Sequence, residues 1–278
     1  MFSRLWLPIQ EHIDSINGSM PGVHHYTSVE GARGILRSGR IWFTERAHLN
    51  DPTKISHGIQ IAQSLLHESD KASGAARLAY IAKEVFRNFC FFSASFSFVG
   101  DDISQWTRYA DGGRGVVLSF KATVFDHPKI FADRLIAGDP TAVACPISYD
   151  LERLRLIMSS IIRCWDGLNI EELSDHIFMI AGMFKADAWK EENEYRFFVH
   201  HRHSEISKNP HYKTRSQEGS VIPYLDLPIQ GWHSPDDLPI YRVCVGPNAP
   251  RDLEARLADF MRVRKIWPHL GIGRSEIA

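Results

Sequence analysis

The feature that most constrains this fold is the run 89–98, FCFFSASFSF, in which large apolar residues alternate with serine or alanine. Alternation with a period of two puts one set of side chains on each face of a β-strand, so the run predicts a half-buried strand. Ser93, Ser95 and Ser97 interrupt it. Because no stretch approaches about 18 consecutive apolar residues, we expect no transmembrane helix and no membrane partner.

Strand and helix patterns are interleaved around this run. Strands are expected at 23–27, 40–44, 89–98, 115–120, 142–149, 194–201, 221–227, 240–245 and 270–277. Helices are expected at 29–38, 55–68, 75–88, 151–165, 170–185 and 251–263, with a short one after Asp102. The spacing lacks the regularity of βαβ units, so the pattern favours an α+β fold with a mixed, mostly antiparallel sheet.

Composition places the chain among ordinary globular proteins. Hydrophobic residues make up 44% and charged residues 23% of its 278 residues, which excludes a disordered or coiled-coil chain. The formal net charge of -1 excludes a nucleic-acid footprint over the whole surface, although not a local basic patch. The four cysteines form no C-x-x-C pair and no signal peptide precedes them, so we expect a reduced, cytoplasmic protein.

The length suits one large domain or two small ones. We expect a single domain over 1–278, with a helical insertion at about 150–187, because no linker rich in Pro, Gly or Ser flanks that segment. The usual motifs for phosphate cradles, zinc proteases and nucleophile elbows do not occur. The glycine-rich segment 112–115 precedes a strand, which favours a hairpin turn.

Four short motifs combine histidine, aromatic and acidic residues. They are His24-His25-Tyr26-Thr27-Ser28, Asn50-Asp51-Pro52, Ser104-Gln105-Trp106 with Tyr109, and Glu192-Asn193-Glu194-Tyr195-Arg196. In this order they resemble a bacterial family known as domain-of-unknown-function family 2971. Its pattern runs H-Y-T, then N-D-P, then W-x-x-Y before G-x-x-x-x-F, then E-x-E-x-R, and the resemblance extends from about residue 23 to residue 277.

That family is itself similar to a distant branch of the ADP-ribosyltransferase superfamily, whose members split NAD at the nicotinamide–ribose bond within a split β-sheet. The resemblance therefore implies an ADP-ribosyltransferase-like split sheet, with NAD as substrate and no metal. In the H-Y-E class of that superfamily the reacting groups come from a strand histidine, an aromatic residue and a strand glutamate. The corresponding catalytic residues here are His25, Tyr109 or Trp106, and Glu194. The implied NAD-binding residues are His25, Tyr26, Thr27, Asn50, Asp51, Trp106, Tyr109 and Arg196.

The chemistry explains why such residues would be needed. Cleavage of a glycosidic bond passes through an oxocarbenium-like state, which the carboxylate of Glu194 would stabilise. His25 would hydrogen-bond the ribose hydroxyls, and Tyr109 or Trp106 would stack on the nicotinamide ring. Arg196 lies two residues after Glu194 on the same strand face, where it would orient that carboxylate or neutralise a phosphate.

Each motif also has a purely structural interpretation. The alternatives are a buried strand histidine at His25, an Asx turn at 50–52, core packing of Trp106 and Tyr109, and a surface salt bridge between Glu194 and Arg196.

Three functions are left open. The leading hypothesis is an NAD-dependent ADP-ribosyltransferase or NAD glycohydrolase, acting as a toxin or phage-defence effector. Its acceptor would be nucleic acid, protein or water, and an antitoxin would be its natural partner. The second is a metal-dependent nuclease that uses the acidic run 187–194. The third is a non-catalytic nucleotide-sensing or interaction module.

Overall fold

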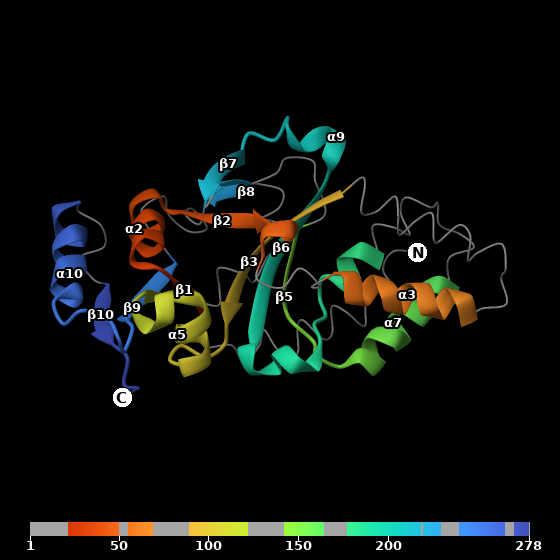
Figure 1. Cartoon of the computed structure of the whole chain (residues 1–278), viewed down its shortest axis with the longest axis horizontal. Helices are drawn as coiled ribbons and strands as arrows, with labels where there is room; N and C mark the ends of the chain where they lie inside the picture. Colours follow the sequence, from red (N-terminus) through yellow and green to blue (C-terminus); the bar gives the residue numbers. More distant parts are fainter. Residues whose placement is uncertain are drawn as a thin grey trace.

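The computed structural model describes residues 22–49, 55–68, 89–121, 142–163, 177–217, 219–228, 239–264 and 270–277. Within these residues ten strands form one open, mixed and mostly antiparallel sheet, which confirms the α+β fold class (Figure 1). The strands are β1 (Val23–Thr27), β2 (Arg40–Glu45), β3 (Phe89–Ser97), β4 (Val116–Phe120), β5 (Ala142–Pro146), β6 (Glu194–Arg202), β7 (Tyr212–Gln217), β8 (Ser220–Pro228), β9 (Ile240–Val245) and β10 (Gly271–Arg274). The helices are α2 (Val29–Ser38), α3 (Ser56–Glu68), α5 (Ile103–Tyr109), α7 (Leu151–Arg163), α9 (His203–Ile206) and α10 (Leu253–Val263).

The sheet branches at β3. Along one edge β3 pairs with β6 over its whole length, from Phe89 to Ser97. The other edge is shared: Ser97 pairs with β1, whereas Phe92 and Ser93 pair with β2. No strand among the described residues pairs with this edge at Ala94–Phe96. The strands β1 and β2 therefore diverge and leave an opening in the sheet at this segment.

Helix α2 connects the two diverging strands and follows local sequence rules closely. The hydroxyl of Ser28 accepts a hydrogen bond from the backbone N–H of Gly31 (3.0 Å) and caps the N-terminus. The helix ends at Gly39, which adopts a φ of 62° that favours glycine. Its apolar stripe at Ala32, Ile35 and Leu36 is buried in the main core. The predicted helix at 29–38 is confirmed.

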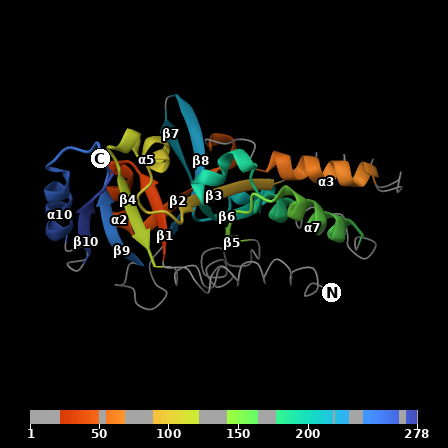
Figure 2. The same cartoon turned by 90° about the horizontal axis from the view of Figure 1, so that it is seen from below.

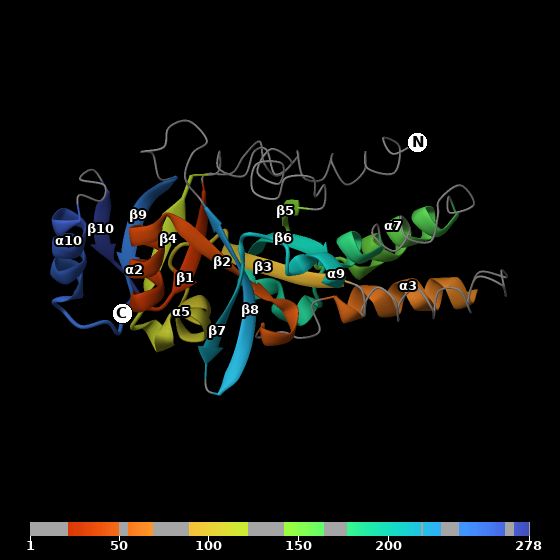
Figure 3. The same cartoon turned by 90° about the horizontal axis from the view of Figure 1, so that it is seen from above.

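Among the described residues, two larger cores and one small one stabilise the sheet. The main core lies against α2 and α10, and a second core packs α3, α7 and the helical turn at 177–181 against Phe91 and Phe198. Helices α3 and α7 run beside each other at the end of the molecule opposite α10 (Figures 2 and 3). The small third core places Trp106 of α5 against Tyr26 of β1.

Several boundaries differ from the sequence-based expectations. Strand β7, with the polar sequence YKTRSQ, was not expected, because a solvated edge strand lacks apolar alternation. The expected helix at 170–185 is helical in its described part only at 177–181, and the 3-10 turn η5 (Asp187–Glu192) follows. Residues 112–113 form no hairpin but belong to the 3-10 turn η2 (Asp111–Gly113), which joins α5 to β4. The helix expected at 75–88 lies outside the described residues.

Candidate functional site

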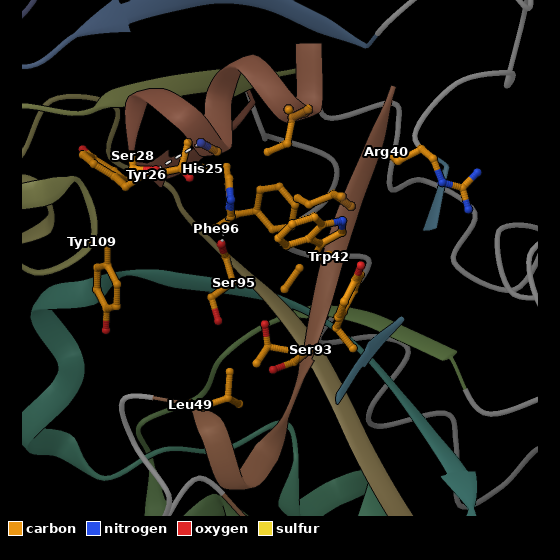
Figure 4. A pocket seen from close by; sticks show the side chains of 18 of the residues that line it. His25, Tyr26, Ser28, Arg40, Trp42, Leu49, Ser93, Ser95, Phe96 and Tyr109 are labelled. Atoms are coloured by element: carbon orange, nitrogen blue, oxygen red, sulfur yellow. Dashed lines mark hydrogen bonds between the residues drawn. The ribbon is translucent and has the colours of Figure 1, made fainter. Parts of the chain in front are cut away.

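A cavity of about 790 Å³ opens where β1 and β2 leave β3, and we call it the split-edge cavity. Its volume lies in the range of about 300–1,000 Å³ that is typical of small-molecule sites. The segment Ala94–Phe96 of β3 lines it, between β1 and α2 on one side and β2, β7 and β8 on the other. Figure 4 shows Phe96 between His25 and Trp42, with Ser95 below His25. The part of β3 that lies between its pairings with β1 and β2 is therefore part of the wall.

His25 contacts this edge directly. Its Nδ1 lies 3.0 Å from the carbonyl oxygen of Ser95. Since a carbonyl only accepts, Nδ1 carries the proton, and the neutral ring keeps Nε2 as a hydrogen-bond acceptor. Burial lowers the pKa of His25, and the bond to the carbonyl opposes that effect only in part. The imidazole is therefore neutral at pH 7.

Glu194 approaches Ser95 from the strand on the other side. The Ser95 hydroxyl donates to Glu194 Oε1 at 2.6 Å. Arg196 donates Nε–H to Oε1 and an Nη2–H to Oε2, both at 2.8 Å. The carboxylate is only 2% exposed, yet it lines the split-edge cavity. His25 and Glu194 thus meet at one residue, His25 at the backbone carbonyl and Glu194 at the side chain.

Glu192 forms a second buried carboxylate beside the first. Its Oε1 accepts a hydrogen bond from the Tyr109 hydroxyl at 2.5 Å, and its Oε2 forms an ion pair with Lys185 Nζ, also at 2.5 Å. Lys185 also lies 3.4 Å from Glu194. Burial and the bond to Glu192 raise the pKa of Tyr109, which stays protonated. Two carboxylates and two buried cations, Lys185 and Arg196, form a nearly dry cluster, and the exposed Arg108 lies 3.7 Å from Glu192 at its edge.

The same contacts bear on the nuclease hypothesis. The four carboxylate oxygens of Glu192 and Glu194 each accept from a protein donor, and a divalent cation would have to displace those donors. No group of three or more His, Cys, Asp or Glu side chains in the described part of the chain is arranged to hold a metal ion. Nothing in this cluster favours metal-dependent cleavage.

The sequence-predicted residues fall into three groups. His25, Tyr26, Thr27, Tyr109 and Glu194 line the split-edge cavity. Trp106 and Arg196 are fully buried and do not line it, and Asn50 and Asp51 lie outside the described residues.

Two of the expected ligand contacts need correction. The Trp106 indole donates Nε1–H to Asp101 at 2.6 Å and packs edge-on against Tyr26, so of the two aromatic candidates only Tyr109 reaches the cavity. Arg196 donates to Glu194 and to the Gly182 carbonyl, and it is fully buried and does not line the cavity, so it positions a carboxylate and does not reach a phosphate there.

Other lining residues were not expected from the sequence. Gln105 is 4% exposed, and its Nε2 has no hydrogen-bond partner within the described residues. Ser93 is buried with its hydroxyl unpaired among the same residues. Buried polar groups are nearly always hydrogen-bonded, so two such atoms in residues that line one cavity point to a polar ligand or ordered water. The serine alternation of β3 was the one available signal for Ser93.

The site is thus a ligand-sized, polar cavity in the split edge of an α+β sheet. Residues 105–197 match a family model described as a protein of unknown function (DUF2971), the family that the motifs resemble. The matched segment contains Tyr109, Glu192, Glu194 and Arg196, whereas His25 precedes it. No curated protein and no solved structure matches the chain. No described helix is both long and apolar enough to cross a membrane.

Proposed function

We propose that this chain binds NAD in the split-edge cavity and cleaves its nicotinamide–ribose bond, as an ADP-ribosyltransferase or NAD glycohydrolase. The observation that carries the proposal is the position of His25 and Glu194, which line one cavity and share Ser95. The motif resemblance to the ADP-ribosyltransferase superfamily supplies the reaction. A role as a toxin or phage-defence effector, with nucleic acid, protein or water as acceptor, follows from the same resemblance.

Glu194 is the residue that would stabilise the transition state. Loss of nicotinamide leaves positive charge on the ribose, and an oriented carboxylate favours that charge. Arg196 holds both oxygens of Glu194, so the carboxylate needs little reorganisation when substrate binds. A ribose hydroxyl would take the place of the Ser95 hydroxyl on Oε1.

His25 and the residues of α5 would orient the substrate. The unprotonated Nε2 of His25 would accept a hydrogen bond from a ribose hydroxyl. The ring of Tyr109 would stack on nicotinamide, while its hydroxyl stays bonded to Glu192. Gln105 lies one turn earlier on α5, and its Nε2, which has no hydrogen-bond partner in the described part of the chain, would bind the carboxamide of nicotinamide.

Release of nicotinamide from NAD tests the proposal directly. We expect release by the unmodified protein, a loss of about 100-fold or more in Glu194→Gln, and a smaller loss in His25→Asn. Glu191→Gln, an exposed carboxylate three residues earlier, is the matched control and should behave as the unmodified protein. Absence of release from the unmodified protein, or full release from Glu194→Gln, would refute the assignment.

One observation favours a second candidate, a nucleotide-binding module without turnover. Both oxygens of Glu194 already accept hydrogen bonds from protein donors, so neither oxygen can bind a ribose hydroxyl unless a protein donor moves away. Such a module would be protected by NAD against thermal unfolding, because a ligand that binds only the folded state stabilises it. Protection without nicotinamide release identifies the module, and protection with release identifies the enzyme.

A further inference from the structure

The wall of the split-edge cavity that faces His25 is built by a ribbon of three strands, β2, β8 and β7. Trp42 stands on this ribbon with 47% of its surface exposed. Thr44 pairs with Ser93 of β3, so a continued ladder would place Trp42 opposite Ser95. The ladder with β3 ends at Thr44, so Trp42 has no partner on β3; on the other edge of β2 it pairs with Asp226 of β8. Trp42 and Ser95 both line the cavity (Figure 4). An exposed indole therefore faces the region where the substrate ribose would lie.

The register puts aromatic and cationic side chains on the same face of this ribbon. Tyr224 pairs with both Thr44 and Lys213, and Arg215 follows Lys213 by two residues. Since alternate residues share a face, Trp42, Tyr224, Lys213 and Arg215 all project to the side that lines the cavity. The Tyr224 ring centroid lies 4.7 Å from that of Trp42, and the Arg215 guanidinium lies 5.1 Å from the indole.

The same face carries an excess of positive charge. Asp226 is its one carboxylate within the described ribbon, and two cations already pair with it, Arg40 at 2.9 Å and Lys213 at 2.5 Å. Arg215 pairs with no carboxylate in the described residues, and its buried Nε has no hydrogen-bond partner there. Three cations against one anion leave two uncompensated positive charges. A ligand with an anionic group would supply the missing partner.

We infer that this ribbon face binds the base and phosphates of a nucleoside diphosphate, with the base stacked on Trp42 and the phosphates against Arg215 and Lys213. Aromatic stacking on a nucleobase and a guanidinium on a phosphate are the contacts that such side chains make best. The inference rests on the proposed function, because the adenosine diphosphate half of NAD must lie away from the nicotinamide. His25 and Glu194 on the facing wall would then hold the ribose of the other half.

Binding of ADP, measured by isothermal titration calorimetry, tests the inference without any turnover. We expect the unmodified protein to bind ADP, and Trp42→Ala and Arg215→Ala each to weaken binding by about tenfold or more. Trp42→Phe should retain most of the affinity. The matched controls are Tyr241→Ala, an exposed aromatic on β9 outside the cavity, and Arg256→Ala, an exposed cation on α10.

Two simpler probes assign the two parts of the subsite. Adenosine should lose affinity in Trp42→Ala but not in Arg215→Ala, and inorganic pyrophosphate should show the opposite dependence. Failure of the unmodified protein to bind ADP, or equal affinity in the variants and the controls, would overturn the inference. Circular dichroism spectra and melting temperatures close to those of the unmodified protein verify that the variants fold.

The outcome separates this inference from the proposed function. Glu194→Gln should bind ADP with unchanged affinity while it loses nicotinamide release. If the unmodified protein does not release nicotinamide but its binding of ADP depends on Trp42, the subsite stands and the catalytic proposal fails. If Trp42→Ala cleaves NAD with an unchanged KM, the subsite is wrong and the catalytic proposal stands.

Discussion

Replacement of Arg196 by methionine would test whether the buried ionic cluster holds the site together. Arg196 is fully buried and donates two hydrogen bonds of 2.8 Å to Glu194 and one of 2.7 Å to the Gly182 carbonyl. Methionine fills a similar volume without charge or donors. Of these side-chain contacts, Glu194 would keep the Ser95 hydroxyl at 2.6 Å and the Lys185 ammonium at 3.4 Å. The buried part of the cluster would then hold two carboxylates and one cation, Lys185.

The magnitude follows from the bonds that are lost. A hydrogen bond to a charged group contributes about 1.5–3 kcal/mol, and removal of one partner of a buried ion pair costs about 3–5 kcal/mol in all. We expect Arg196→Met to lower the free energy of unfolding by about 3–5 kcal/mol. The double variant Arg196→Met with Glu194→Gln carries no uncompensated carboxylate at position 194. Its loss of unfolding free energy should therefore be about 2 kcal/mol smaller than the sum of the losses in the two single variants.

Urea unfolding followed by far-UV circular dichroism measures these free energies. Arg256→Met, which removes the exposed pair with Asp252 on α10, is the matched control and should change stability by about 0.5 kcal/mol or less. A loss below about 1 kcal/mol in Arg196→Met, or strict additivity in the double variant, would refute the reasoning. Either result would mean that the cluster contributes little to the stability of the site.

Three further predictions concern single positions. Burial and then the charge of Arg242 lower the pKa of His24 to about 4. Between pH 6.5 and pH 4, His24 is therefore protonated in the unfolded chain and neutral in the folded chain. Stability should therefore fall as the pH drops from 6.5 to 4, and His24→Asn should reduce that fall by about 1–2 kcal/mol in urea unfolding. Gln105→Leu should leave the melting temperature equal or higher, because it removes an unpaired buried amide, and should raise KM in the nicotinamide-release assay. Gly115→Ala would place a Cβ 2.3 Å from the carbonyl oxygen of Thr27 in β1 and should lower the free energy of unfolding by about 1–3 kcal/mol. Its control is Gly34→Ala on α2, where the added Cβ meets open space and should raise the free energy of unfolding by about 1 kcal/mol; thermal unfolding measures both.

Local signals predicted most of the elements that frame the site. The cap at Ser28, the stop at Gly39 and the period-two alternation of β3 act within a few residues of the chain, so they can be read before any tertiary contact forms. The motifs likewise pointed to His25, Tyr109 and Glu194, which all line the split-edge cavity. Trp106 belongs to the same motif as Tyr109, but its position on the short helix turns it into the core.

The amino-acid order by itself determined the fold class, the boundaries of α2 and β3, and the shared strand face of Glu194 and Arg196, because these depend on periodicity and capping. Only the tertiary structure decided which chemistry meets where. The divergence of β1 and β2 from one edge of β3 opens the cavity, and the pairing of β2 with β8 brings Trp42 beside Asp226 on its wall. These pairings join residues that lie 49 (Thr44 and Ser93), 73 (His24 and Ser97) and 184 (Trp42 and Asp226) positions apart, and no local pattern contains that information.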